Sequence, residues 1–140
     1  MWANDSACKQ LGIEITDIGP GRARLEMVIS GTMANGFGMC HGGFIFALAD
    51  SAFAYACNTH GEKVVAAQGS ITYLRPGSPG ERLVAVAQER ARMKRSGIYD
   101  VNVATADGTT VAEFRGHSRV IGPSDHPAKA AQPDPGRRTP

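Results

Sequence analysis

Residues 42–57 read GGFIFALADSAFAYAC, one of the most apolar stretches of this 140-residue chain. Alanine and leucine are good helix formers, no proline interrupts the run, and the run is too long for an ordinary strand. The stretch therefore predicts one long, largely buried helix. It is too short for a membrane span and it carries a carboxylate, Asp50, so it does not predict a transmembrane segment.

Asp50 and the start of this helix are the first candidates for chemistry. An unpaired buried charge costs several kcal/mol after relaxation, so a carboxylate in an apolar helix needs a partner or a function. The helix opens on His41, Gly42 and Gly43, where the first amides have no acceptor within the helix and carry partial positive charge. Such amides suit an oxygen that gains negative charge during a reaction. One segment thus offers both an oxyanion site and a carboxylate.

Composition argues against several classes of protein. The formal net charge is +2, which gives no case for a nucleic-acid-binding protein. Residues 1–6, MWANDS, lack the basic and apolar regions of a secretion signal. Cys8, Cys40 and Cys57 are odd in number and lack the spacing of a zinc site, so we expect reduced thiols. These features predict a cytoplasmic protein that neither enters a membrane nor holds a metal.

After the long helix the pattern changes to short runs typical of strands. The runs are separated by turns such as residues 75–80, RPGSPG, and the pair Asp107-Gly108, which is a hairpin signal. Four strands are predicted, at residues 64–74, 82–92, 98–105 and 110–120. Such closely spaced strands imply an antiparallel sheet, and the long apolar helix must cover its inner face.

The remaining elements complete an α+β domain in which an antiparallel sheet wraps a long central helix. Residues 5–11 predict a helical turn, and residues 13–30 predict two strands broken at residues 19–21, GPG. Gly61 is expected to end the long helix. We expect one domain over residues 1–122 and a disordered tail over residues 123–140, where Pro, Ala, Lys, Arg and Asp follow no periodicity.

Four motifs together resemble a known family. They are NGFGMCHGG at residues 35–43, LADSAFAYACN at 48–58, YLRPG at 73–77 and SGIYD at 96–100. In this order they resemble the hotdog-fold thioesterases, and among them the phenylacetic-acid-degradation thioesterases, over roughly residues 5–121. The resemblance implies a hotdog fold, hydrolysis of acyl-coenzyme A (acyl-CoA) thioesters without a metal or other cofactor, and dimers that pair into tetramers. It favours phenylacetyl or hydroxylated phenylacetyl as the acyl group.

The same resemblance implies roles for particular residues. Gly42 would polarise the thioester carbonyl, Asp50 would attack it or activate water, and Asn35 would help to place the water or the carboxylate. Some members of the family have Ser or Thr where this chain has AAQG at residues 66–69. The sequence therefore leaves open how the water is held.

The spacing of Gly42 and Asp50 predicts that two chains build one site. Eight residues of helix span about 12 Å along the axis, since each residue rises about 1.5 Å. An attacking atom and an oxyanion donor must each lie about 3 Å from the reacting centre, so one carbonyl cannot contact both groups of one helix. A twofold dimer with antiparallel helices would bring them together twice.

Each candidate also has a purely structural interpretation. Asp50 could be held by backbone amides or by an arginine across an interface, and Gly42 could simply begin the helix beside a close neighbour. His41 could orient the loop by a hydrogen bond or act near the carbonyl. A Cys40–His41 dyad is disfavoured because adjacent side chains usually point apart. Asn35 could be a turn residue without a role in the site.

Coenzyme A carries phosphates, so its binding site needs cations near the surface. The best candidates are Lys94 and Arg95, followed by Ser96 and Gly97, in a turn between two predicted strands; a solvated hairpin is the alternative. Two further arginines, Arg75 and Arg119, rank second.

Two other functions fit the same fold. A noncatalytic acyl-CoA-binding protein would bind the ligand without releasing thiol, although it would not need Asp50. A hydratase or dehydratase would use an Asp and a His together, and His60, near the far end of the helix, is poorly placed for that.

Overall fold

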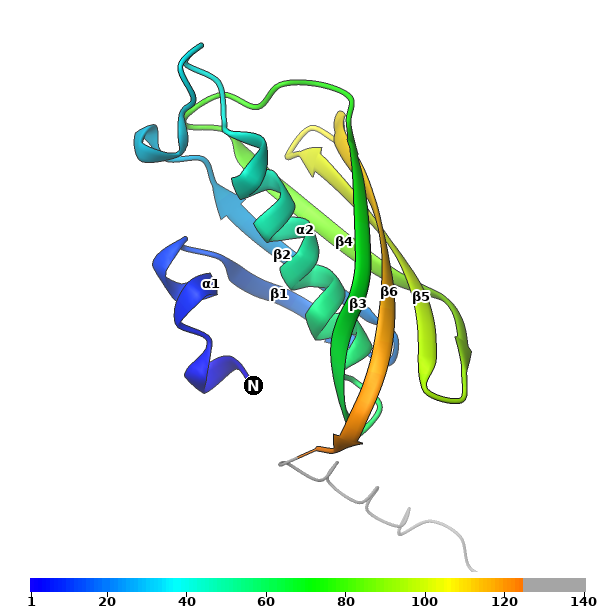
Figure 1. Ribbon diagram of the computed structural model, residues 1–140. Coiled ribbons are helices and arrows are strands. Elements are labelled where there is room, and N and C mark those ends of the chain that lie inside the picture. The colour runs from blue at the N-terminus through cyan, green and yellow to red at the C-terminus, as the bar shows by residue number, and fades with distance from the viewer. Residues whose placement is uncertain (125–140) are drawn as a thin grey trace, which may run out of the picture.

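The computed structural model describes residues 1–124 and contains one long helix within a curled sheet (Figure 1). Neighbouring strands are antiparallel, in the order β1-β2-β4-β5-β6-β3. The helical elements are η1 (Trp2–Asn4), α1 (Ser6–Gln10), η2 (Gly31–Met33) and α2 (Gly42–Cys57). The strands are β1 (Glu14–Gly19), β2 (Arg22–Val28), β3 (Glu62–Tyr73), β4 (Arg82–Met93), β5 (Ser96–Thr105) and β6 (Thr110–Pro123).

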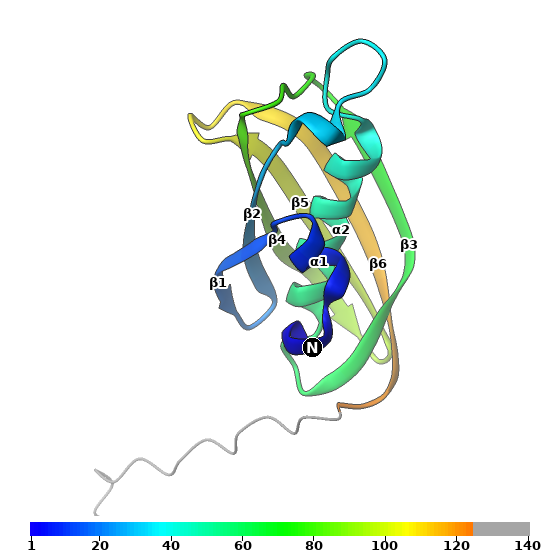
Figure 2. The same cartoon turned by 90° about the vertical axis from the view of Figure 1, so that its left-hand side faces the viewer.

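Helix α2 lies in the concave face of the sheet (Figures 1 and 2). It fits there because the strands present every second side chain inward, as the regular alternation of burial along β5 shows. Leu48 and Phe53 of α2 and Leu25, Leu83 and Val101 of the sheet have no exposed surface. Each such side chain contributes about 1.5–3 kcal/mol by leaving water, so this contact is the main stabilisation of the fold. The predicted α+β hotdog arrangement is confirmed.

Strand bounds differ slightly from those predicted. Strands β3 and β5 each begin two residues earlier than expected, and β6 continues to Pro123 because Pro123 pairs with Glu62 across the sheet. The predicted domain boundary at residue 122 therefore falls inside β6. Beyond Ser124, the predicted tail lies outside the described residues.

The prediction that Gly61 ends the long helix is wrong. Helix α2 ends at Cys57, and Asn58 closes it through its side chain. The Asn58 amide nitrogen donates to the carbonyl oxygens of Ala54 at 2.8 Å and Val64 at 2.9 Å, and its oxygen accepts from the Val64 amide at 3.0 Å. Gly61, with φ of 75°, instead shapes the turn into β3.

Strand β3 is a free edge of the sheet, next to β6 on one side only. Its residues are exposed or half-buried along the whole strand, although residues 64–73, VVAAQGSITY, carry no charge. A long uncharged edge is a template for pairing with another strand. Helix α1 lies over part of α2 at the N-terminal end of the chain (Figure 2), where the Cys8 thiol donates to the Ser51 hydroxyl at 3.3 Å.

Candidate active site

His41 fixes the start of α2. Its Nδ1 accepts a hydrogen bond from the Gly43 amide at 2.9 Å, and its carbonyl oxygen accepts from the Phe44 amide at 3.0 Å. The neutral ring therefore carries its proton on Nε2. His41 is thus the N-cap of α2. Of the two roles considered for it, this is the one that orients the loop by a hydrogen bond.

Gly42 has an unpaired amide and a close neighbour. Within residues 1–124 its N–H donates no hydrogen bond, while its carbonyl oxygen accepts one from the Tyr73 hydroxyl at 2.8 Å. A Cβ at residue 42 would lie 2.9 Å from Tyr73 Cζ, so any larger residue here must displace the phenol ring. Burial, and to a smaller extent Cys40, raises the pKa of Tyr73, which keeps the phenol protonated as a donor at neutral pH.

Asp50 lies on α2, two turns beyond Gly42, and is half-buried. In the part of the chain that the structure describes, its carboxylate forms neither a hydrogen bond nor an ion pair. Burial raises the pKa of Asp50, because the charged form loses solvation without gaining a partner. A carboxylate in this state is more basic than usual and is available to accept a proton.

Asn35 shapes the loop before α2. Its side-chain oxygen accepts from the amides of Phe37 at 2.9 Å and Met39 at 3.2 Å, so this oxygen is committed to the turn. Its amide nitrogen has no hydrogen-bond partner within residues 1–124 and stays available to a ligand. Asn35 is therefore a turn residue through its side-chain oxygen. Its side-chain nitrogen remains as the donor for any role in the site.

A hollow of about 460 Å³ adjoins Gly42 at this end of α2. Its walls are mainly apolar and comprise Cys40, Gly42, Ile45, Tyr73, Leu74, Arg75 and Pro76. The Arg75 guanidinium lies 3.3 Å from the Glu81 carboxylate, and its Nε is buried without a hydrogen-bond partner. Arg75 therefore lies beside Gly42 at the N-terminal end of α2, not beside the predicted phosphate turn.

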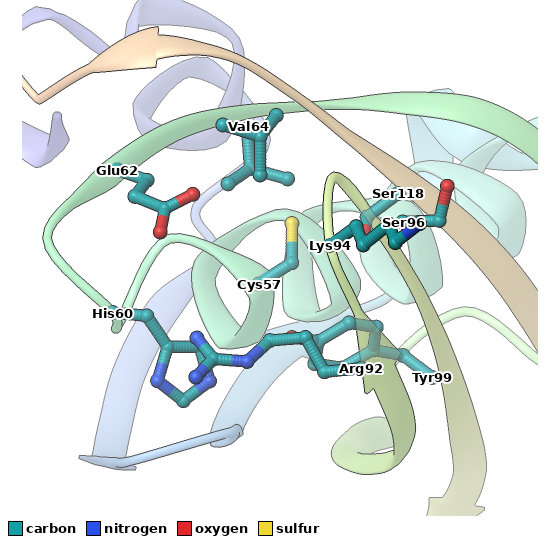
Figure 3. A pocket seen from close by; sticks show the side chains of 10 residues that line it. Cys57, His60, Glu62, Val64, Arg92, Lys94, Ser96, Tyr99 and Ser118 are labelled. Atoms are coloured by element: carbon teal, nitrogen blue, oxygen red, sulfur yellow. The ribbon is translucent and has the colours of Figure 1, made fainter.

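Lys94 and Arg95 form the turn between β4 and β5 as predicted, but they face different cavities. Lys94, with φ of 53°, and Ser96 line a polar pocket at the C-terminal end of α2 (Figure 3). Arg95 lines another hollow, beside Glu62 and Ile121. The two hollows are neighbours, since Glu62 and Val120 line both.

The two remaining predicted ligand residues, Gly97 and Arg119, lie on different faces of the sheet relative to the polar pocket. Gly97 is buried, and a Cβ there would be 2.6 Å from the Ser118 hydroxyl, so its packing alone explains the glycine. Arg119 follows Ser118 on β6 and is exposed on the opposite face, away from the polar pocket.

Two residues at these sites were missed by the sequence analysis. Tyr73 was quoted as part of a motif without a role, and Arg92, which lines the polar pocket, was not considered. Among residues 1–124, no group of three His, Cys, Asp or Glu side chains is arranged to hold a metal ion.

The sheet curled around α2 and the start of α2 at Gly42 define a class of protein. Comparison with known proteins gives the same class. Residues 37–112 match the thioesterase superfamily. The chain belongs to this superfamily and has its hotdog fold.

Within the superfamily, the chain is similar to the acyl-coenzyme A thioesterase PaaI of Escherichia coli K12. The two are 46% identical over 122 residues, which is 87% of each chain. The solved structure of E. coli PaaI, from the phenylacetic acid degradation operon, has a TM-score of 0.87 and covers 89% of this chain and 90% of its own. A mutant of phenylacetic acid degradation protein PaaI from Thermus thermophilus is 36% identical, with a TM-score of 0.80, and covers 84% of this chain and 100% of its own.

Proposed function

We propose that this protein hydrolyses acyl-CoA thioesters, with phenylacetyl or hydroxylated phenylacetyl as the acyl group. The observation that carries the proposal is the half-buried Asp50 carboxylate, which has a raised pKa and no partner within residues 1–124, on a helix whose first amide, that of Gly42, is also unpaired. The similarity to acyl-CoA thioesterase PaaI supports the substrate class. The apolar hollow formed in part by Ile45, Tyr73 and Leu74 supports an aryl group beside the thioester.

The working enzyme is a dimer in this proposal. Gly42 and Asp50 belong to one continuous helix and are about 12 Å apart along its axis, so a single chain cannot place both at one carbonyl. The uncharged free edge of β3 supports pairing of β3 with its copy, which would set two α2 helices side by side and antiparallel. A dimer of dimers extends the same arrangement.

The reaction then follows from the two groups. The thioester oxygen accepts a hydrogen bond from the Gly42 amide, which stabilises the negative charge that forms as the carbonyl is attacked. Asp50 of the partner subunit removes a proton from water, and the water oxygen bonds to the carbonyl carbon; direct attack by the carboxylate is the alternative route. Collapse of the tetrahedral intermediate expels the CoA thiolate, which takes up a proton, and leaves the free acid.

A thiol-release assay across aryl- and alkyl-acyl-CoA substrates tests this function. Hydrolysis with the highest kcat/KM for arylacetyl substrates is the expected result. Binding of acyl-CoA without thiol release would indicate a noncatalytic binding protein instead. The hydratase alternative would need His60 beside Asp50. His60 Nε2 instead lies 2.7 Å from the Glu89 carboxylate, at the other end of α2 from Gly42.

The proposed location is the cytoplasm, where CoA thioesters would be available. No helix among the described residues is long and apolar enough to cross a membrane. Cys8, Cys40 and Cys57 are all buried free thiols, which is consistent with a reducing compartment.

The contact between Gly42 and Tyr73 gives a first prediction. Gly42→Ala keeps the amide but pushes the Tyr73 ring aside, and we expect kcat to fall roughly ten-fold because small displacements of an oxyanion donor are costly. Gly36→Ala is the matched control, since a Cβ at residue 36 meets no atom within 4 Å. Steady-state kinetics measure both. Equal kcat values for the two variants would show that the close fit at residue 42 is irrelevant to turnover.

The turn cations give a second prediction. Lys94→Asn with Arg95→Gln removes two charges, and asparagine tolerates the positive φ of residue 94. We expect KM for acyl-CoA to rise at least about ten-fold with kcat nearly unchanged, because the lost contacts are made equally in the ground and transition states. Added salt should imitate the effect. A thioester truncated before the nucleotide is the control, and the same KM increase for it would exclude both residues from nucleotide binding.

A further inference from the structure

Phe37 is the most exposed large apolar residue among residues 1–124, at 86% of its surface. It lies at the tip of the loop between η2 and α2, midway between Ala34 and Cys40, which pair with each other at the base of the loop. Figures 1 and 2 show this loop extending beyond the start of α2, on the side opposite to the end of the helix. An aromatic ring in this position is suited to burial against another surface.

The loop holds Phe37 in a fixed place. The Asn35 side-chain oxygen accepts from the Phe37 amide at 2.9 Å, and the Asn35 carbonyl oxygen accepts from the Gly38 amide at 3.0 Å. The Asn35 amide in turn donates to the Met39 carbonyl oxygen at 2.6 Å. The loop is therefore ordered before any contact forms, so docking of the ring costs little conformational entropy.

A hollow of about 420 Å³, here called the N-terminal hollow, lies at the other end of α2. It is bounded by the start of the chain, the end of α2 and the start of β3, and its walls include Met1, Asn4, Asn58, Lys63 and Val65. Met1 and Val65 are exposed apolar residues that nothing in the described part of the chain covers. Lys63 brings a cation to the wall, and the face of an aromatic ring attracts a cation. The hollow therefore suits an aromatic side chain.

The twofold dimer of the proposed function brings Phe37 and this hollow to the same level. Gly42 of one chain and Asp50 of the partner subunit must be level along the two helices to serve one carbonyl, so the twofold axis is level with residue 46. Asn58, at the end of α2, is about 18 Å from that level. In the opposite direction Gly42 is about 6 Å from it, and the loop from Cys40 to Phe37 reaches up to about 10 Å farther. The two distances from the axis nearly match, so each loop tip arrives beside the hollow of the other chain.

We propose that Phe37 of each subunit packs into the N-terminal hollow of a second copy of this chain, an inference that rests on the two-chain site of the proposed function. Twofold symmetry forms the contact twice in each dimer. Phe37 precedes Gly42 by five residues, in a loop that leads directly into α2. The contact therefore ties the loop before each Gly42 amide to the subunit that supplies Asp50 to the same site.

Chemical cross-linking of the full-length protein tests the contact directly. Asn4→Cys with Phe37→Cys places one thiol on the hollow and one on the loop. A short bismaleimide cannot join them within one chain, because they lie at opposite ends of α2, whose sixteen residues span about 24 Å. We expect most of the double variant to run as a covalent dimer on a denaturing gel. The wild type and both single variants should not link, since the native cysteines are buried.

A matched pair of cysteines controls for chance collisions. Asn4→Cys with Met93→Cys uses another highly exposed residue, Met93, at 75% of its surface. The residues on either side of Met93 line a pocket at the C-terminal end of α2, so the twofold axis carries the partner's Met93 to the far end from the hollow. No covalent dimer from the loop pair, or equal yields from the two pairs, overturns the proposal.

Dissociation of the dimer gives a second measurement. Phe37→Ser should raise the dissociation constant of the dimer at least about 100-fold, because every dimer loses two buried aromatic contacts, whereas Met93→Ser should leave it nearly unchanged. Sedimentation velocity over a dilution series, in enough urea to begin dissociating the wild type, compares the three proteins. Equal dissociation constants for Phe37→Ser and the wild type would contradict the contact.

The outcomes separate this contact from the proposed function. A wild type that is monomeric at every concentration refutes both the two-chain site and the contact. A dimer that releases thiol from acyl-CoA but gives no covalent link through residues 4 and 37 refutes the contact alone. A linked dimer that releases no thiol from any CoA ester refutes the function and supports the contact.

Discussion

Asp50→Asn is expected to fold and bind acyl-CoA, and to release thiol at least about 100-fold more slowly than the wild type. The substitution preserves the shape of the side chain and deletes its negative charge, which the proposed reaction needs whether Asp50 acts as a base or as a nucleophile. KM should change little, so the loss should appear in kcat. A thiol-release assay under saturating substrate measures it. Retention of more than about a tenth of wild-type kcat would contradict both roles.

A matched control separates the loss of function from the loss of a charge. Asp17→Asn makes the same substitution on the surface strand β1, where Asp17 pairs with Arg22, and should leave kcat unchanged. Isothermal titration with a nonhydrolysable acyl-CoA analogue should give similar affinities for the wild type and Asp50→Asn. A large loss of affinity in Asp50→Asn would place Asp50 in substrate binding instead.

The raised pKa of Asp50 predicts a second property of the same variant. The folded state holds the Asp50 proton more tightly than the unfolded state, whose reference pKa is 3.8. The free energy of unfolding therefore decreases as the pH rises from below 3.8 through the raised pKa of the folded protein. At neutral pH the wild type carries this cost in full and Asp50→Asn does not. Asp50→Asn should unfold at a higher temperature at neutral pH, and the difference should diminish as the pH falls below the raised pKa.

Local patterns in the sequence identify the central helix and its two key residues. The run from residue 42 to residue 57 has no competing structure, so both the start of α2 at Gly42 and the position of Asp50 within it follow from the residues themselves. The end of α2 does not follow in this way. Asn58 closes the helix by bonding to Val64 in β3, and this side-chain contact prevails over the general preference for a glycine at Gly61.

The contacts that complete the sites depend on sheet order, which the sequence analysis did not derive. Tyr73 reaches Gly42 across 31 residues of chain because β3 runs along the side of α2. Arg92 and Ser118 line one pocket because they lie in the same row of paired residues across β4, β5 and β6, with Gly97 between them. Lys94 and Arg95 are adjacent in sequence, which suggested one phosphate clamp, but they line two neighbouring hollows that share Glu62 and Val120.

Two inactive variants are expected to restore activity to each other. Asp50→Asn lacks the carboxylate. Gly42→Pro lacks the amide donor, at the first position of a helix, where proline is often tolerated. The proline ring displaces Tyr73, which is 48% exposed and has room to move, and Gly42→Ala shares this displacement while keeping the amide. The difference in activity between Gly42→Ala and Gly42→Pro therefore measures what the amide donor of residue 42 contributes.

Unfolding the two variants together in equal amounts and refolding them tests whether one site takes residues from two chains. About half of the dimers should be mixed, and each mixed dimer has one site with an intact Gly42 and an intact Asp50, opposite a site that lacks both. Roughly a quarter of wild-type activity should return, whereas each variant refolded alone should stay inactive. Mass spectrometry or differently tagged subunits confirm that mixed dimers form, and circular dichroism confirms that Gly42→Pro is folded. With both conditions met, no recovery would mean that the site lies within one chain or that Gly42 or Asp50 is wrongly assigned, because only a shared site can combine the intact halves of two damaged subunits.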